Sequence, residues 1–339
     1  MHGSVCFVIR LEPGTVFLMY SRMQHLSAAL LLIFLFTAGC TPESDTSGGG
    51  VSSDGVFRVV ATTGHIADAV RNIAEGTGAE ITLLCGPGVD PHSYAPTAAD
   101  VRSMAGATVI FYNGFHLESR LHNALHHQFD DKSWAMASAF PEDARLDWIE
   151  DGEKDPDAPF DPHIWNHLPG WAECVTALAE QMAQRDPANG DQYRANGRKY
   201  VEKIELTHAA AEAKFMAIPK EQRVLVSAHD AFNYFAKVYE FETVAVLGIG
   251  NDAEADVKTM QNVATTICDR QVPVIFIENI TNPKVTQALQ EACQSRNWNV
   301  TIAEQPLYSD DLGSEPPANT YLGAFESNVN LLTESLKQQ

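Results

Sequence analysis

The sequence predicts an α/β protein of two similar lobes, each a parallel-type sheet covered by helices, joined by one long rigid helix. Short β-rich runs alternate with helical stretches from residue 57 onward, and the alternation restarts near residue 224. A long stretch without helix breakers separates the two series. With 339 residues and 45% hydrophobic content, the chain is long enough for two cores of ordinary size. Such alternation is typical of parallel sheets with helices on their faces.

The first lobe is expected to span residues 57–186. Its β-rich runs and helical stretches follow one another at intervals typical of strand–helix–strand units. The predicted strands lie near residues 58–63, 80–84, 108–112 and 134–139, and the predicted helices at 66–74 and 98–105.

The linking helix is expected to span residues 187–218. It follows Asp186-Pro187, an N-cap residue before a proline at the first helical position, and stops before Pro219. Large or apolar residues recur at intervals compatible with one helical face: Tyr193, Tyr200, Ile204, Ala211 and Phe215. About thirty helical residues would extend about 45 Å, long enough to cross a domain. We expect this spine to limit hinge motion, because its only glycines, Gly190 and Gly197, both lie early in the stretch.

The second lobe is expected to span residues 219–339 and to repeat the alternation of the first. The predicted strands lie near residues 224–228, 243–247, 274–278 and 299–303, and the predicted helices at 231–239, 255–270 and 284–295.

The first 39 residues are predicted to be a signal peptide. Their apolar stretch, 26–36, is too short to span a bilayer but suits a secretion signal. It is followed by Thr37-Ala38-Gly39-Cys40, which resembles a bacterial lipobox, so Cys40 is expected to be the lipid-bearing N-terminus of the mature protein. The alternative is a free cysteine after an ordinary signal. For residues 1–22, a start codon assigned too early, with Met23 as the true start, explains the segment at least as well as an extended positive region.

Residues 40–56 are predicted to be a flexible, lipid-anchored tether, because they have almost no apolar side chains with which to form a packed structure. The protein is therefore expected outside the cytoplasm, in the periplasm or on the cell surface, anchored to a membrane through Cys40.

The acidic composition argues against nucleic acid as a partner. Forty-four acidic and 23 basic residues give a formal net charge of −21, which repels the phosphate backbone of nucleic acids.

The cysteines after Cys40 show no CxxC pattern; Cys268 and Cys293 either pair in an oxidising compartment or remain isolated thiols.

Three histidines and one aspartate are candidate metal ligands: His92, His163, His229 and Asp310. The first two occur in repeated Asp-Pro-His tripeptides, and each of the four follows a predicted strand. Because α/β proteins place ligands at the carboxyl edges of their sheets, the four side chains are expected to converge in the cleft between the lobes. Three imidazoles and a carboxylate are a plausible first shell for a divalent transition metal.

Neighbouring carboxylates are candidates for orienting these imidazoles: Asp90, Asp161, Asp230 and Glu278. The remaining histidines are weaker candidates. His65 follows the first predicted strand, whereas His116, His122, His126 and His127 lie in an apparently helical stretch and are expected on the surface.

Several motifs in fixed order make the chain resemble the metal-binding receptors of ABC importers, the TroA/ZnuA-like solute-binding lipoproteins that deliver zinc or manganese. They include Gly-Pro-Gly-Val-Asp-Pro-His-Ser-Tyr at 86–94, Asp-Pro-His-Ile-Trp at 161–165 and Ser-Ala-His-Asp-Ala-Phe at 227–232. Further matches lie at 62–63, 66–74, 113–118, 276–278 and 307–310. The pattern is most similar to that of the treponemal-type (TroA-like) receptors. It implies two lobes joined by a rigid helix, with His92, His163, His229 and Asp310 as ligands.

The resemblance leaves the metal open between Zn²⁺, Mn²⁺ and Fe²⁺. Zinc-dedicated members often carry a long histidine-rich loop before the second ligand motif, where this chain has only an acidic stretch without histidine, 147–157. Many manganese-specific relatives have glutamate as the third ligand, whereas this chain has His229, and added imidazole favours zinc, iron or copper over manganese.

The resulting hypothesis is a monomeric receptor that binds one divalent metal between its lobes and passes it to a membrane permease of an ABC importer, without a covalent reaction. An extracytoplasmic zinc hydrolase is the first alternative, with Glu278 or Asp230 as general base, but a fourth protein ligand, Asp310, would displace the water that it needs. A surface adhesin is the second alternative, although adhesion does not require four convergent ligands.

Overall fold

The structure is a computed structural model that describes residues 55–150, 153–154, 158–250 and 257–337. The predicted signal peptide, Cys40 and all of the predicted tether except its last two residues lie outside these ranges. Within the described ranges, no helix combines the length and the apolar character needed to cross a bilayer.

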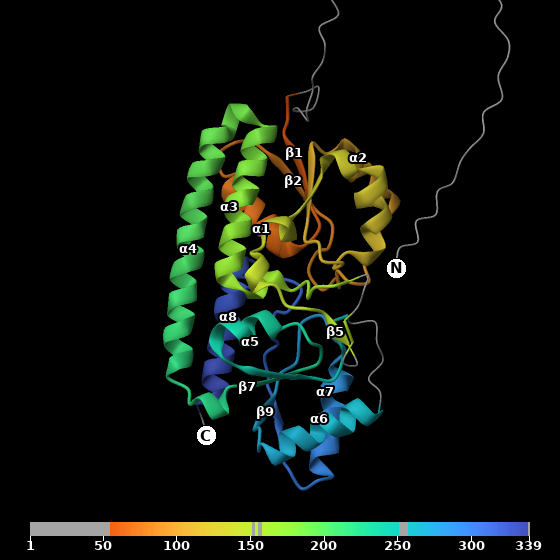
Figure 1. The fold of residues 1–339 in the computed structure, drawn as a ribbon, viewed down its shortest axis with the longest axis vertical. Helices are drawn as coiled ribbons and strands as arrows, with labels where there is room; N and C mark the ends of the chain where they lie inside the picture. The colour runs from red at the N-terminus through yellow and green to blue at the C-terminus, as the bar shows by residue number, and fades with distance from the viewer. Residues whose placement is uncertain (1–54, 151–152, 155–157, 251–256, 338–339) are drawn as a thin grey trace, which may run out of the picture. The chain divides into compact units, whose positions relative to one another are not determined.

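A four-stranded parallel sheet, in the order β2-β1-β3-β4, forms the centre of the first lobe (Figure 1). The strands are β1 (Arg58–Ala61), β2 (Glu80–Leu83), β3 (Val109–Tyr112) and β4 (Ser133–Ala135). Helix α1 (Gly64–Ile73) follows β1, and α2 (Ala98–Gly106) precedes β3. The side chain of Thr63 begins α1 because it accepts a hydrogen bond from the N–H of Ile66. A short antiparallel pair, β5 (Ile149–Glu150) and β6 (Glu153–Lys154), lies apart from this sheet.

The predicted strand at 134–139 is wrong in its second half. Strand β4 ends at Ala135, and residues Met136–Ala139 form a 3₁₀ turn. The hydroxyl of Ser138 donates to the carbonyl of Ala135 at 2.6 Å, which offers the backbone a local turn in place of the next ladder bond.

The second lobe contains two parallel strand pairs. β7 (Val224–Ser227) pairs with β8 (Glu242–Ala245), and β9 (Val274–Ile275) pairs with β10 (Thr301–Ile302). The N–H of Phe276 donates to the carbonyl of Val226 at 2.8 Å and joins the two pairs. The lobe also holds α5 (Asn233–Tyr239), α6 (Val257–Asp269) and α7 (Pro283–Gln294), and a hydrophobic cluster connects the strands to α6 and α7.

Strand β7 ends at Ser227, one residue earlier than predicted, where a side chain replaces part of the ladder. The carboxylate of Glu278 accepts hydrogen bonds from the N–H groups of Ala228 and His229, at 2.8 and 3.0 Å. Those backbone groups are therefore satisfied without a neighbouring strand.

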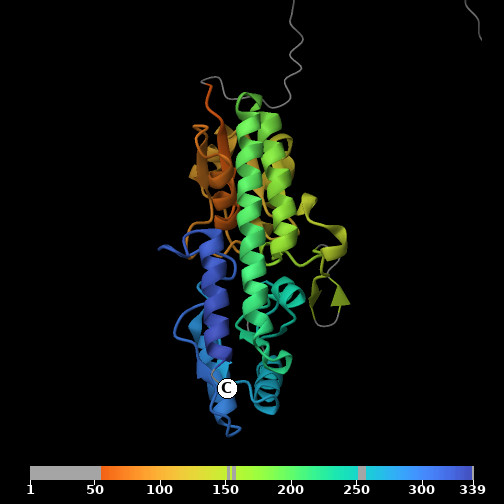
Figure 2. The same ribbon diagram turned by 90° about the vertical axis from the view of Figure 1, so that its left-hand side faces the viewer.

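Three helices pack side by side: α3 (Leu168–Arg185), α4 (Gly190–Met216) and α8 (Tyr321–Leu336). Helix α3 lies beside the part of α4 in the first lobe, and α8 beside its part in the second. Helix α4 has 27 residues, which corresponds to roughly 40 Å at ~1.5 Å per residue. Figure 2 shows α4 passing from the half that contains β1 and α1 to the half that contains α5 and α8. The predicted elements include neither α3 nor α8.

Both lobes hold α4. In the first lobe, the side-chain amide of Asn196 donates to the carbonyl of Ile73 at 3.0 Å, and the hydroxyl of Tyr200 donates to the carboxylate of Asp68. In the second, the ring of Phe215 packs against that of Phe235, 5.4 Å between centroids. One hydrophobic core runs through both lobes along these helices. The architecture confirms the predicted α/β class with a long, rigid connecting helix, while the predicted lobe boundaries stay predictions.

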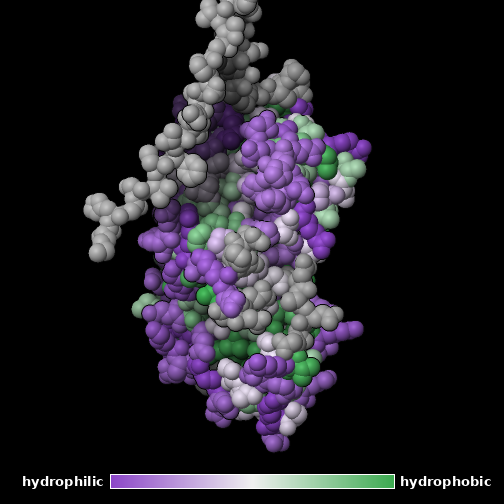
Figure 3. Space-filling view, turned by 45° about the vertical axis from the view of Figure 1, so that its right-hand side comes forward, coloured by the Kyte–Doolittle hydropathy of each residue, from purple (hydrophilic) through white to green (hydrophobic). Residues whose placement is uncertain are grey.

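The face of the molecule drawn in Figure 3 is largely polar. Figure 3 shows one face on which hydrophilic residues predominate and hydrophobic ones gather in the lower half, where the second-lobe elements lie. Among the described residues, the large hydrophobic side chains that are exposed are Ile149, Leu206, Met216 and Val257. They are spread over β5, α4 and α6, so most of the bulky apolar side chains lie in the core.

Candidate metal centre

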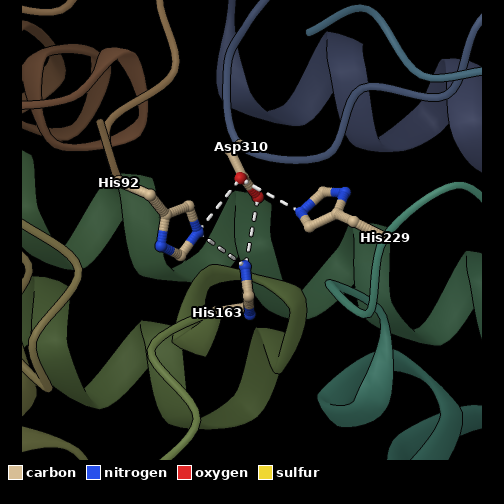
Figure 4. Close-up of side chains that lie close together, drawn as sticks. All are labelled: His92, His163, His229 and Asp310. Atoms are coloured by element: carbon tan, nitrogen blue, oxygen red, sulfur yellow. Dashed lines mark hydrogen bonds and ion pairs between the residues drawn. The ribbon is translucent and has the colours of Figure 1, made fainter. Parts of the chain in front are cut away.

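The structure brings His92, His163, His229 and Asp310 together, and their ligand atoms all lie within 4.8 Å of one another. Figure 4 shows the three imidazoles pointing at the carboxylate from separate segments of the chain. Nε2 of His92 and of His163 each lie 3.3 Å from an oxygen of Asp310, and Nε2 of His229 lies 3.1 Å away. Four ligands about 2.0–2.1 Å from a tetrahedral zinc ion would be roughly 3.3 Å apart. The three contacts to Asp310 are close to this spacing, and the group as a whole is compact enough to surround one divalent ion.

The first histidine is positioned by a turn after β2. The carboxylate of Asp90 accepts the N–H of His92 at 2.8 Å and the hydroxyl of Ser93 at 3.0 Å. Such a turn is a common use of aspartate in loops. The hydroxyl of Ser119 donates to the His92 carbonyl at 3.0 Å, which fixes the loop from its other side.

The second histidine, His163, is held by the same kind of turn, and its aspartate also contacts the imidazole ring. Asp161 accepts the N–H of His163 at 2.9 Å and also lies 2.7 Å from Nδ1 of its imidazole. The second oxygen of Asp161 accepts the side-chain amide of Asn233, from α5, at 3.1 Å. Because Nδ1 faces a carboxylate, the Nε2 atom is directed at the centre of the site.

The third histidine directly follows β7. Nδ1 of His229 contacts one oxygen of Glu278, and the other oxygen of Glu278 accepts the N–H groups of Ala228 and His229. Glu278 therefore fixes both the backbone and the ring of His229.

The aspartate is held by contacts between distant segments. The indole N–H of Trp165 donates to the carbonyl of Ser309 at 2.8 Å, which joins the residues beside His163 and Asp310. The carboxylate of the neighbouring Asp311 accepts the N–H of Gly88 at 2.6 Å, from the loop that leads to His92.

The site is closed to solvent: His92 is 5% exposed, and the other three side chains are 1% exposed or less. Burial alone would lower the pKa of His163, but the carboxylates of Asp310 and Asp161 outweigh it and raise the pKa to about 9. Against the same effect of burial, Glu278 and Asp310 raise the pKa of His229 well above its ordinary value. Burial would raise the pKa of Asp310, yet the two imidazoles hold it well below the usual range. Without a metal, the carboxylates therefore favour protons on the imidazoles, at the place where a cation would bind.

Of the four carboxylates predicted to orient the imidazoles, two contact a ring nitrogen. Asp161 contacts His163 and Glu278 contacts His229, whereas Asp90 bonds only the backbone N–H of His92. No ring contact is described for Asp230, whose own N–H donates to the carbonyl of Gly248.

The other histidines lie outside the group. His65 is buried and stacked on Trp165 with 4.7 Å between ring centroids, and burial lowers its pKa to about 3. The side chains of His116, His122, His126 and His127 are exposed. The thiols of Cys268 and Cys293 are free.

Trp165, Asp311 and Asn113 also support the site, and none of the three was predicted to do so from the sequence. The side-chain amide of Asn113 donates to the carbonyl of Pro162 at 2.8 Å, which holds the second Asp-Pro-His loop. The only signal in the sequence is position, since Trp165 and Asp311 lie within two residues of candidate ligands.

The fold and the site define a class: a two-lobed α/β solute-binding protein with a candidate metal centre between its lobes. Residues 59–335 match the family described as ZnuA, zinc-uptake complex component A, periplasmic. The chain belongs to this family.

Similar proteins are named for different metals. The manganese-binding lipoprotein MntA of Bacillus subtilis is 34% identical over 93% of this chain and 99% of its own length. The zinc-binding protein TroA of Treponema pallidum is 35% identical over 84% of this chain and 90% of its own. A solved structure of the periplasmic zinc-binding TroA superposes with a TM-score of 0.78 over 83% of this chain and 99% of that one, at 35% identity.

Proposed function

We propose that this chain is an extracytoplasmic solute-binding lipoprotein that captures one divalent transition metal between its lobes and delivers it to the permease of an ABC importer. The observation that carries the proposal is the convergence of three buried imidazoles and one buried carboxylate at spacings that fit a metal. Similarity to one protein named as a manganese-binding lipoprotein and another named as a zinc-binding protein supports it.

In this proposal His92, His163, His229 and Asp310 are the ligands, while Asp161 and Glu278 orient two of the imidazoles. Three imidazoles with one carboxylate favour zinc or iron over manganese, which prefers oxygen ligands. We expect zinc to outcompete manganese at equal free concentration, although zinc, manganese and iron are all candidate cargoes.

No covalent reaction is expected. Four protein ligands leave a tetrahedral ion without an open position for water, and the oxygens of Glu278, the candidate general base, already contact the backbone and ring of His229. The same closed site supports transport of the ion over hydrolysis or adhesion.

The proposal also includes a lipid anchor at Cys40, which lies outside the described residues, and a monomeric receptor that docks on its permease. The polar surface and the net charge of −21 fit a protein that remains apart from nucleic acids.

Competitive zinc titration of single alanine variants tests the ligand set. His163→Ala, His229→Ala and Asp310→Ala should each weaken binding strongly, because each removes one of four ligands. His127→Ala, which removes an exposed imidazole, is the matched control and should keep the tight affinity. Normal zinc binding by His229→Ala would show that the assigned ligand set is wrong.

A further inference from the structure

Four exposed histidines lie together on the first lobe, and the interlobe site uses none of them: His116, His122, His126 and His127. The ring centroids of His122 and His126 are 4.5 Å apart, and that of His116 lies 6.4 Å from His122. These three, but not His127, line a surface pocket of about 440 Å³. The pocket therefore gathers three imidazoles with no assigned role.

The backbone places two of them on one face. A helical run begins with a 3₁₀ turn at Ser119–Leu121 and ends in a π-helical turn at Ala124–Gln128, closed by the N–H of Phe129 on the carbonyl of Ala124 at 2.8 Å. His122 and His126 are four residues apart, the spacing at which helical side chains meet and at which histidine pairs hold metals. π-Helical turns are rare and frequent at functional sites.

A strained turn positions His116, the third histidine of the pocket. Gly114, Phe115 and His116 have successive positive φ angles of 88°, 50° and 68°. Two non-glycine residues in this region cost of order 1–3 kcal/mol each, so the surroundings must stabilise the turn. Glu118 does so, because its carboxylate accepts the N–H groups of Asn113 and Gly114 at 2.7 and 3.2 Å.

We propose that His116, His122 and His126 form a second, weaker site for a divalent transition cation that prefers imidazole, with zinc as the probe. Three imidazoles leave a fourth position for water, as in open zinc sites. The site is expected to be weaker than the interlobe site because its exposed side chains must turn inward and lose rotamer freedom. Among the described residues, the interlobe group is the only one whose ligand atoms already lie close enough together to hold an ion, so the rings of His116, His122 and His126 must move on binding.

The surroundings are compatible with a bound cation. The pocket also contains Arg145, but its guanidinium lies over the ring of Phe115, 5.5 Å from the centroid, and donates to the carbonyl of Phe140 at 3.2 Å.

Zinc titration of the full chain by calorimetry, carried to free zinc well above the dissociation constant of the tight site, tests the proposal. The wild type should bind two equivalents, and the double variant His122→Gln/His126→Gln only the tight one. His127→Gln, an exposed neighbour outside the pocket, should still bind two. Because the replaced side chains are exposed, thermal unfolding of these variants should match the wild type.

His163→Ala separates this inference from the proposed function. It should lose the tight equivalent and keep the weak one. A single equivalent in the wild type that His163→Ala abolishes would overturn the second site and leave the proposed function intact. A single equivalent that survives in His163→Ala but is lost in the double variant would support the second site and contradict the proposed function. A second equivalent that the double variant retains would also overturn the assignment to His122 and His126.

Discussion

Replacing Glu278 by glutamine tests how the protein prepares His229 to bind a metal. In the wild type, one oxygen of Glu278 accepts the N–H groups of Ala228 and His229 and the other contacts Nδ1 of the ring. Glutamine can keep the first oxygen in place. Its NH₂ group would then face Nδ1 of His229, and a donor there favours the tautomer with hydrogen on Nε2, the atom that must bind the metal.

The expected loss follows from these contacts. Loss of a carboxylate that orients a metal-binding histidine typically weakens affinity about 10–100-fold, which corresponds to about 1.4–2.8 kcal/mol. Because His229 and Glu278 are buried, water does not restore the lost contact. We therefore expect Glu278→Gln to be near the upper end of this range.

Competition against a chromogenic chelator at pH 7.5 measures the zinc affinity of both proteins. Asp230→Asn is the matched control: it neutralises a carboxylate adjacent to His229 in sequence for which no ring contact is described, and should change affinity by less than about threefold. Affinity of Glu278→Gln within twofold of the wild type would refute the assigned role of Glu278. Unfolding curves would show whether a larger loss reflects misfolding instead.

Three further predictions concern protons and stability. The pKa of His163 is raised to about 9, and that of His229 is raised well above its ordinary value. Zinc binding at pH 7.5 should therefore release at least one proton, and zinc affinity should rise with pH toward about 9. Calorimetry in buffers of different ionisation enthalpy would contradict this prediction if it showed no proton release. The ring of His167 accepts a hydrogen bond from the N–H of Gly170 at the start of α3, and burial lowers the pKa of His167 from 6.5 to about 4. As the pH falls from 6.5 to 4, the histidine is protonated in the unfolded chain but not in the folded one. Acidification over this range should therefore destabilise the fold. The free energy of unfolding should fall by at most about 1.4 kcal/mol per pH unit, and by less because His167 is partly screened by solvent. Urea unfolding of His167→Asn at pH 7 and pH 5 should show a smaller loss of stability than the wild type. A loss equal to that of the wild type would be evidence against this role of His167. Bound zinc should stabilise the folded chain by about 2.7 kcal/mol when the free zinc concentration is 100 times the dissociation constant. The melting temperature should therefore fall when a chelator removes the zinc, and an unchanged melting temperature would contradict this prediction.

Local patterns were enough to predict the α/β class and the shared position of the four site residues. His92 and His229 follow the carboxyl ends of β2 and β7, where ligands of parallel sheets are expected. The sequence did not show which carboxylate orients the ring of His229. Asp230 is next to His229 in sequence, but Glu278, about fifty residues away, contacts the ring because the chain after β9 lies beside β7.

Two of the helices were not predicted from the sequence. Helices α3 and α8 each contain a glycine in the first turn, Gly170 and Gly323, which resembles a helix breaker. Both are required by tertiary packing: a Cβ on Gly170 would lie 2.4 Å from the ring of Phe140, and one on Gly323 would overlap the carbonyl of Pro317. These close approaches depend on the folded chain, so no local pattern could indicate them.

X-ray absorption of the protein loaded with one equivalent of zinc would identify the atoms that bind the ion. At this loading the tight site fills first. We expect a four-coordinate ion with three imidazole nitrogens and one carboxylate oxygen at about 2.0–2.2 Å, and the loss of one imidazole in His229→Ala. A shell with fewer than three imidazoles, or with several water oxygens, would contradict it.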